Sequence, residues 1–233
     1  MLTLAVETSG ITASCAVIED GKVKSELSTM HGKTHSQKIM PMIKAVLSMI
    51  DKDLKEVDLF AASVGPGSFT GLRIGVVTIK GLAYSLKRPV YGVPTLDALA
   101  YSMPDFNGII SPMLDARNNQ VFTAFFRKIN GNLDKIDPES GITISEWIDK
   151  AEMYNENIII LGDAADLHFA KLKDIFGDKI VCSQQAMSFP RASATALLAE
   201  KAYHNNQVAT AFELEPFYLR KSQAERLKKT KEK

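Results

Sequence analysis

Ser-Val-Gly-Pro-Gly-Ser-Phe-Thr-Gly-Leu-Arg-Ile-Gly, residues 63–75, joins an apolar run at 59–64 to a mostly apolar helical pattern that ends at Leu86. This order predicts a strand, a tight loop and the start of a helix. Such a helix start presents backbone N–H groups without intrahelical partners, and its dipole adds partial positive charge, so it can hold an anion. The candidate contacts are Gly65, Gly67 and Ser68. No Lys-Ser or Lys-Thr follows the last glycine, so the loop is not a Walker motif.

The residues before this loop predict three strands and a helix. Strands are expected at 2–6, 14–18 and 22–29, with a hairpin at Asp20-Gly21, and a helix is expected at 35–50. The turn after the first strand carries Glu7, Thr8 and Ser9, which form a second candidate phosphate loop. A short strand at 90–92 should follow the helix that ends at Leu86.

The second half of the chain repeats this plan. Expected strands lie at 109–114, 121–127 and 157–161, with a helix at 166–175 and another at 192–203. An acid, Asp115, again ends the first strand, and the hairpin glycine follows it by 16 residues, against 14 in the first half. We therefore expect an α/β protein with duplicated mixed-sheet lobes and flanking helices. The expected boundaries are 1–103, 104–215 and a basic tail at 216–233. This plan is similar to the two-lobed actin-like (ASKHA) fold, in which the turn after the first strand approaches nucleotide phosphates and a divalent metal.

The amino-acid composition of the chain reduces the number of possible function classes. The 233 residues are 45% apolar with a net charge of +1, which argues against a general electrostatic hold on nucleic acid. The two cysteines lack metal-ligand spacing and fit a reducing compartment. With no expected signal peptide or membrane span, the prediction is a cytoplasmic protein. A frayed, solvated terminus is the simplest interpretation of the basic tail, and a contact with tRNA is the alternative.

Two helical patterns, at 35–50 and 70–86, are apolar around more of their circumference than a core-facing stripe requires. Either the protein's own sheet and loops cover both helices, or one side of each packs on a second protein. We favour the second, because a lobe of about 100 residues has few layers to cover such helices. The predicted interface consists of Ile39, Met42, Ala45, Val46, Met49, Ile74, Thr78, Gly81 and Ser85. Without a partner, the same surface should form a homodimer.

Several segments in the same order resemble the TsaB (YeaZ) family. They are 4–9 (Leu-Ala-Val-Glu-Thr-Ser), His35-Ser-Gln with Pro41, 64–75, 92–96 (Gly-Val-Pro-Thr-Leu), 112–117 (Pro-Met-Leu-Asp-Ala-Arg) and 216–222 (Pro-Phe-Tyr-Leu-Arg-Lys-Ser) with Ala224-Glu225. The resemblance implies a role in making threonylcarbamoyladenosine beside the tRNA anticodon. It also implies a non-catalytic paralogue that pairs with the transferase TsaD, with the ATPase TsaE as a further partner.

The residues at two positions that matter for catalysis in TsaD-type enzymes agree with a non-catalytic paralogue. TsaD-type enzymes carry a His-x-x-x-His metal pair where this chain has Thr95 and Leu99, so no metal is expected there. His31 and His35 are also four apart, but they bracket a glycine turn and are expected to cap or to lie on the surface. The second-lobe turn at 161–165 has one glycine and an acid that would face phosphates unfavourably. We therefore predict no cofactor, with a nucleotide at a subunit junction left open, and keep an autonomous ATP-dependent phosphotransferase as the alternative. A protease is rejected, since Ser68 lacks the Gly-x-Ser-x-Gly pattern and a matched base.

Overall fold

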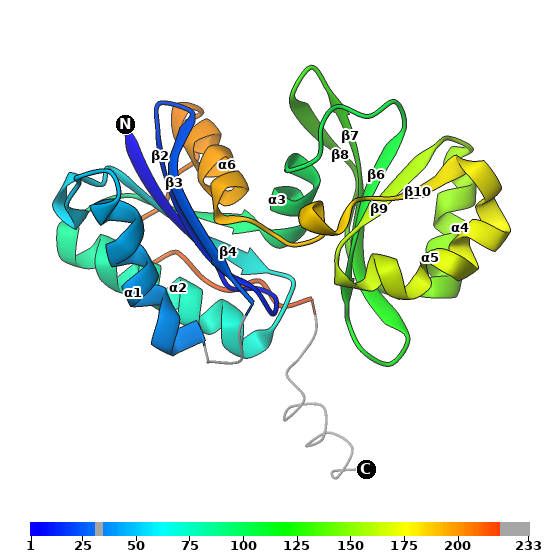
Figure 1. Cartoon of the computed structure of the whole chain (residues 1–233), viewed down its shortest axis with the longest axis horizontal. Coiled ribbons are helices and arrows are strands. Elements are labelled where there is room, and N and C mark those ends of the chain that lie inside the picture. The colour runs from blue at the N-terminus through cyan, green and yellow to red at the C-terminus, as the bar shows by residue number, and fades with distance from the viewer. Residues whose placement is uncertain (31–34, 220–233) are drawn as a thin grey trace, which may run out of the picture.

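The computed structural model describes residues 1–30 and 35–219 and shows two lobes side by side (Figure 1). Each lobe contains a five-stranded sheet with helices packed on its faces. The strands are β1 (Leu2–Glu7), β2 (Ala13–Glu19), β3 (Lys22–Thr29), β4 (Leu59–Gly65), β5 (Val90–Pro94), β6 (Ile109–Asp115), β7 (Gln120–Ile129), β8 (Asn132–Thr143), β9 (Ile158–Leu161) and β10 (Ile180–Cys182). The α-helices are α1 (His35–Ser48), α2 (Phe69–Leu86), α3 (Thr95–Tyr101), α4 (Ile144–Tyr154), α5 (Asp163–Phe176) and α6 (Ala192–His204).

The first sheet has the order β3-β2-β1-β4-β5, with β1 antiparallel to β2 and parallel to β4. Because side chains alternate along a strand, its two faces bury different helices. Leu4 and Val6 of β1 face a core that includes residues of α1 and α2, whereas Ala5 belongs to a core shared with α6. Helices α1 and α2 therefore form one outer layer of the lobe, and α6 covers the other face (Figure 1).

The second sheet repeats the arrangement in the order β10-β9-β6-β7-β8. Its first strand, β6, is antiparallel to β7 and parallel to β9, as β1 is to β2 and β4. Trp147 of α4 and Leu172 of α5 share one core of this sheet, and Leu96 and Leu99 of α3 share another. The matching pair of mixed sheets confirms the expected duplication and the actin-like fold.

The expected extent of the second lobe, residues 104–215, is wrong for its last part. Helix α6 packs on β1, β2 and β4 of the first sheet, so the chain returns to the first lobe before it ends. Beyond α6, the backbones of Ala209 and Val90 pair, and Phe217 N donates to Val64 O at 2.7 Å. We call residues 209–219 the terminal strap. It lies with the first lobe, and its last four residues belong to the expected basic tail. The remainder of that tail, 220–233, falls outside the described residues.

Helix α3 occupies the space between the sheets. Leu96, Ala98 and Leu99 are completely buried, the first and third against the second sheet and Ala98 against the first. Its C-terminal end is held by Lys128 of β7, whose Nζ donates to the carbonyls of Tyr101 and Met103 at 2.6 and 2.5 Å. Within the described parts of the chain, no helix is long and apolar enough to cross a membrane.

Candidate functional site

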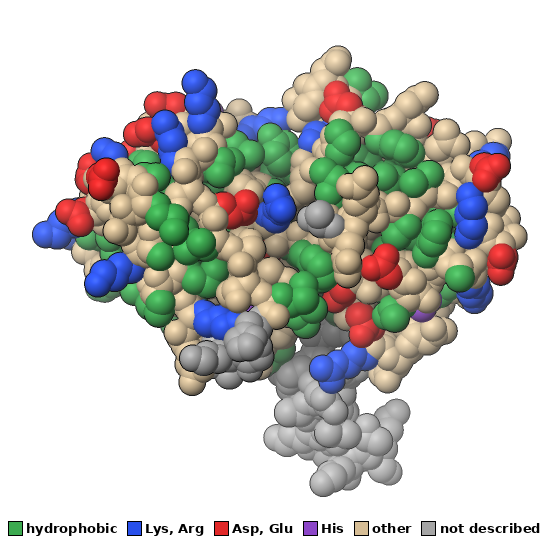
Figure 2. Space-filling model, in the orientation of Figure 1, with side chains coloured by type: hydrophobic (Ala, Val, Ile, Leu, Met, Phe, Trp, Pro, Cys, Tyr) green, Lys and Arg blue, Asp and Glu red, His purple; other side chains and the backbone are tan. Residues whose placement is uncertain are grey.

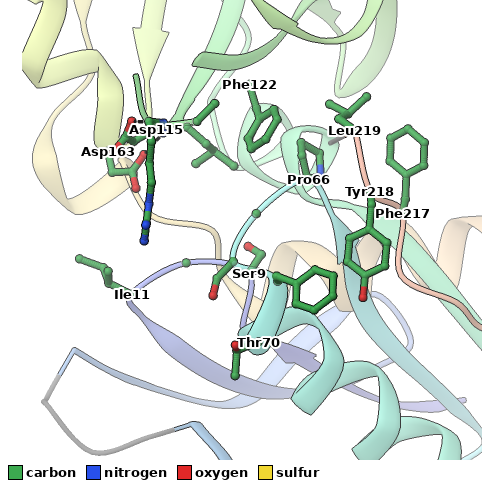
Figure 3. Close-up of a pocket in the computed structure, with 17 residues that line it drawn as sticks. Ser9, Ile11, Pro66, Thr70, Asp115, Phe122, Asp163, Phe217, Tyr218 and Leu219 are labelled. Carbon is green, nitrogen blue, oxygen red and sulfur yellow. Dashed lines mark hydrogen bonds between the residues drawn. The ribbon is translucent and has the colours of Figure 1, made fainter. Parts of the chain in front are cut away.

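A cleft of about 510 Å³ lies between the lobes. Its first-lobe wall consists of the β1–β2 turn (9–11) and the loop into α2 (66–70), and its second-lobe wall includes residues 114–117, Phe122 and Asp163. Figure 3 shows Asp115 and Asp163 together on the second lobe, across from Ser9, Ile11 and Thr70, with Phe217 and Tyr218 of the terminal strap at one side. Both predicted phosphate loops, which belong to the first lobe, thus contribute residues to one cleft.

The first-lobe wall is a tightly packed contact between the β1–β2 turn and the start of α2. Thr8 Oγ1 donates to Gly71 O at 2.8 Å, and Ser68 N donates to Ser9 O at 2.6 Å. A Cβ on Gly67 would lie 2.4 Å from Ser9 O, and one on Gly71 would lie 2.0 Å from Thr8 O. The glycines of this loop therefore allow two backbones to touch.

The predicted loop residues Gly65 and Ser68 also have structural partners. A Cβ on Gly65, whose φ is +125°, would lie 2.4 Å from the carbonyl oxygen of Phe217 in the terminal strap. Ser68 is the N-cap of α2, and its Oγ accepts a hydrogen bond from Gly71 N at 3.3 Å. In the described chain no hydrogen bond joins Ser68 to His35, whose Nε2 pairs with Gly10 O at 2.9 Å. The side chain of Ser68 is therefore used to start the helix.

Glu7 stands where the fold brings an acid close to nucleotide phosphates, but its carboxylate is buried beneath the cleft. Ser9 N donates to Glu7 Oε1 at 2.6 Å, and the hydroxyl of Ser63 donates to Oε2. Ser63 also lies 3.4 Å from the hydroxyl of Thr195 in α6. Burial raises the pKa of Glu7, with the hydrogen bonds from Ser63 and Ser9 opposing that shift. The group is 1% exposed and does not line the cleft.

The second-lobe wall presents two carboxylates. Asp115 N donates to Asp163 Oδ1 at 2.9 Å, and Arg117 N donates to Asp115 Oδ1 at 2.7 Å. Burial raises the pKa of Asp163, and the neighbouring charge of Asp115 adds to the increase. Arg117, Asn118 and Asn119 all have φ between 54° and 60°, so the turn that follows Asp115 is left-handed throughout.

These walls do not fit the nucleotide that an actin-like fold implies. A Cβ on Gly162 would lie 2.1 Å from Met113 O, and Ala164 and Ala165 are buried in the core of the second lobe, so the 161–165 turn packs inward. Asp115 and Asp163 would meet phosphates with like charge. The hydroxyl of Thr8 is engaged by Gly71. We derive no reaction step through a nucleotide in this cleft.

The structure also corrects part of the predicted interface. Ile39, Met42 and Val46 are buried in the first core, because this side of α1 faces the sheet. Ala45, Ile74 and Thr78 are half-buried, and Met49, Gly81 and Ser85 are exposed. The sequence analysis missed four exposed apolar side chains of these two helices: Met40 and Pro41 of α1, with Val77 and Tyr84 of α2. The wide apolar arcs of the two helices were the sequence feature that could have identified these side chains.

The TsaD-like metal position is also enclosed. Thr95 and Leu99 are both 0% exposed, and the hydroxyl of Thr95 has no hydrogen-bond partner. Across the described residues, no group of three or more His, Cys, Asp or Glu side chains is placed to hold a metal ion. His31 lies outside those residues, so its pairing with His35 stays untested. Phe122, Phe217 and Tyr218 line the cleft but were not predicted as site residues.

The paired sheets, with the cleft between them, define a protein of the actin-like class. Residues 28–228 match the family described as TsaD, tRNA N6-adenosine threonylcarbamoyltransferase. The chain is 33% identical over 225 residues to a Bacillus subtilis protein named tRNA threonylcarbamoyladenosine biosynthesis protein TsaB, covering 97% of this chain and 96% of that one. A Haemophilus influenzae protein of the same name is 31% identical over 229 residues, covering 93% and 92%. The chain belongs to the TsaB family of tRNA threonylcarbamoyladenosine biosynthesis proteins.

Solved structures agree with this assignment at the level of the fold. A Pseudomonas aeruginosa protein described as similar to peptidase YEAZ superposes with a TM-score of 0.80 at 24% identity, covering 94% of this chain and 99% of that one. YeaZ from the same organism superposes with a TM-score of 0.75 at 23% identity, with the same coverage. The lobes and their arrangement are therefore those of YeaZ.

Proposed function

We propose that this chain is a non-catalytic scaffold subunit required for threonylcarbamoyl transfer to the tRNA adenosine beside the anticodon. It would pair with a TsaD-type catalytic subunit through the outer surface of α1 and α2. The observation that carries the proposal is the large amount of apolar surface left exposed on these two helices. tRNA is modified in the cytoplasm, where we place the protein.

The exposed residues suit the packing of another helix pair. Val77 and Tyr84 of α2 are 66% and 62% exposed, and Met49, just beyond the end of α1, is 64% exposed, although both helices bury their opposite sides in the core. A Cβ on Gly81 would have no atom within 4 Å, so a partner helix can approach the backbone closely at that point. Exposed apolar patches on helices usually mark protein interfaces. A four-helix arrangement with two helices from each protein would cover this one.

The proposed lack of catalysis is supported by the same cleft that the fold would use for chemistry. The Glu7 carboxylate is buried beneath it, and the Thr8 hydroxyl is bonded to Gly71. Thr95 and Leu99 stand where a TsaD-type metal pair is expected. The transfer chemistry would then belong to the partner, and a nucleotide at the junction of the two subunits would be held largely by the partner's residues.

Three further contacts follow from this role. The apolar surface of α1 and α2 would form a homodimer when the catalytic subunit is missing. A TsaE-type ATPase would join the assembled pair, and tRNA would be reached through the complex. Homodimer and heterodimer would compete, because both use the same surface.

Co-expression of this chain with the TsaD-type subunit of the same organism tests the proposal. We expect the two proteins to elute together from size-exclusion chromatography with a fixed stoichiometry, and the isolated chain to elute as a dimer. Reconstitution with and without this chain should show that tRNA modification depends on it. Failure of the two proteins to associate would contradict the scaffold role.

The alternative function, an autonomous ATP-dependent phosphotransferase, predicts tight binding of magnesium ATP by the isolated chain. That binding should be lost in Thr8→Ala if the turn after β1 holds phosphates. The buried Thr8–Gly71 hydrogen bond favours the scaffold, since a hydroxyl committed to the helix backbone is not free to contact a phosphate.

A further inference from the structure

The terminal strap (209–219) runs along α2, the helix that carries part of the proposed partner surface (Figure 1). Two of its side chains, Ala211 and Leu214, are buried in the core that the first sheet shares with α1 and α2. Its backbone pairs with β5 through Ala209 and with the end of β4 through Phe217. The strap is therefore a fixed part of the first lobe.

Phe212 of the strap points outward, between the two buried anchors. It is 70% exposed. Its ring meets that of Tyr84 in α2 edge to face, with 5.1 Å between the ring centroids, and its carbonyl accepts a hydrogen bond from Lys80 Nζ at 3.1 Å. A large aromatic ring that is held in place in water gains free energy when an apolar surface covers it. Phe212 is thus placed for contact with another molecule.

The ring of Phe212 extends the exposed apolar surface of α2. Val77, Gly81 and Tyr84 are all exposed and are spaced by four and three residues, so they lie on one face of the helix. Phe212 continues this face at its Tyr84 end. Hydrophobic side chains also reach the surface of the first lobe in the area of α1 (Figure 2). The surface proposed for the catalytic subunit therefore continues from the helices onto the strap.

Two exposed acids, Glu213 and Glu215, follow the ring on the strap. Glu213 accepts hydrogen bonds from Thr210 N and Oγ1 at 2.8 and 2.7 Å, and these bonds lower the pKa of its carboxyl, so it is charged at neutral pH. Within residues 1–30 and 35–219, no ion pair joins either acid to a cationic side chain. An apolar ring with unpaired acids at its edge is complementary to an apolar pocket with cations at its rim.

We propose that the strap is a second contact element for the TsaD-type catalytic subunit. Phe212 enters an apolar pocket of that subunit, and Lys or Arg side chains at the rim of the pocket meet Glu213 and Glu215. The inference rests on the proposed function and deepens it, because it adds a contact outside the packed helices. A buried aromatic anchor supplies much of the affinity of such an interface, whereas charges at its rim help to select the partner.

The affinity of the full chain for the TsaD-type subunit of the same organism, measured by isothermal titration calorimetry, tests the strap. Phe212→Ala should weaken binding at least about tenfold, as expected for the loss of an aromatic anchor. Glu215→Gln should weaken it about two- to fivefold and reduce its dependence on salt. Leu167→Ala, at a 72% exposed position on α5 of the second lobe, is the matched control and should bind like wild type. Circular dichroism should show an unchanged Tm for the strap variants, because both side chains are exposed.

Wild-type affinity of Phe212→Ala for the catalytic subunit would overturn the inference. If that variant instead weakens only the homodimer of the isolated chain, measured by sedimentation equilibrium, a second copy covers the ring and the inference is again wrong. Failure of the proposed function gives a different result, because then the wild-type chain itself would not bind the catalytic subunit. Failure of the strap contact alone leaves wild-type binding intact, together with its loss in Gly81→Arg.

Discussion

The hydroxyl of Thr8 donates a hydrogen bond to the carbonyl of Gly71, 63 residues further along the chain, at 2.8 Å in a buried position. This bond joins the turn after β1 to the first turn of α2. It uses the hydroxyl that an actin-like enzyme would offer to a phosphate, and here this hydroxyl holds the start of the helix. The helix in turn carries part of the proposed partner surface.

Two glycine substitutions in α2 test how closely these elements pack. In Gly71→Ala the new Cβ would lie 2.0 Å from Thr8 O, a backbone atom that cannot rotate away. We expect a loss of at least about 1–3 kcal/mol in the free energy of unfolding, the usual cost of overpacking. Gly81→Ala, in open space on the same helix, should instead gain about 0.5–1 kcal/mol. Urea unfolding followed by circular dichroism measures both, and equal effects would contradict the described contact.

Glu7→Gln tests the buried carboxylate. Burial raises the pKa of Glu7 above its ordinary 4.5, so the folded protein holds this proton more tightly than the unfolded chain. The resulting stabilisation is complete below about pH 4.5 and is lost as pH rises through the folded pKa. Glutamine keeps an acceptor for Ser9 N and carries no charge. We therefore expect the variant to be more stable than wild type at pH 7, by an amount that increases with pH above 4.5.

Thermal unfolding from pH 4.5 to 8 measures this difference. A gain of about 1 kcal/mol would raise Tm by about 2–4 °C in a chain of this size. Asp115→Asn, at an exposed carboxylate on the cleft wall, is the matched control. Equal pH dependence of wild type and Glu7→Gln would contradict the buried, desolvated carboxylate.

Gly81→Arg tests the partner surface directly. The site is exposed and a Cβ there meets nothing within 4 Å, so the monomer should fold normally. A long charged side chain should hold a partner helix away and abolish both the heterodimer and the homodimer. Pull-down with the TsaD-type subunit and size-exclusion chromatography measure the two effects. Met153→Arg, at an exposed position on α4 of the second lobe, controls for the added charge. Wild-type affinity in Gly81→Arg would show that the interface is elsewhere.

The two lobes could be predicted from the sequence, but the lobe to which the last elements of the chain belong could not. Strand alternation and the two acid-ended first strands were sufficient for the duplicated sheets. Helix α6 was assigned to the wrong lobe, because chain order carries no information about a return across the molecule. Ile39 and Val46 were misplaced for a related reason: a wide apolar arc says that a helix is covered on several sides, but not which side the sheet covers.

The cleft shows the same limit of prediction from the sequence. Gly67 was predicted in a loop able to hold an anion, and Gly71 lies in the helix start that follows that loop. Only the structure shows that the glycines are needed for contact with Ser9 and Thr8. Phe217 of the strap reaches the cleft because the chain crosses the first lobe after α6, a path without a periodic signal in the sequence.

The last prediction concerns nucleotide binding by the isolated chain. The cleft offers phosphates two carboxylates, Asp115 and Asp163, and the buried Thr8 hydroxyl is already bonded to Gly71, so we expect magnesium ATP to leave Tm unchanged. A ligand present at 100 times its Kd would add about 2.7 kcal/mol and raise Tm by roughly 5–10 °C. Asp163→Asn is a further test of magnesium ATP binding, because it removes one repelling charge and leaves the first lobe unchanged. If wild type shows the full rise and Thr8→Ala abolishes it, the cleft holds a nucleotide and the phosphotransferase alternative replaces the scaffold.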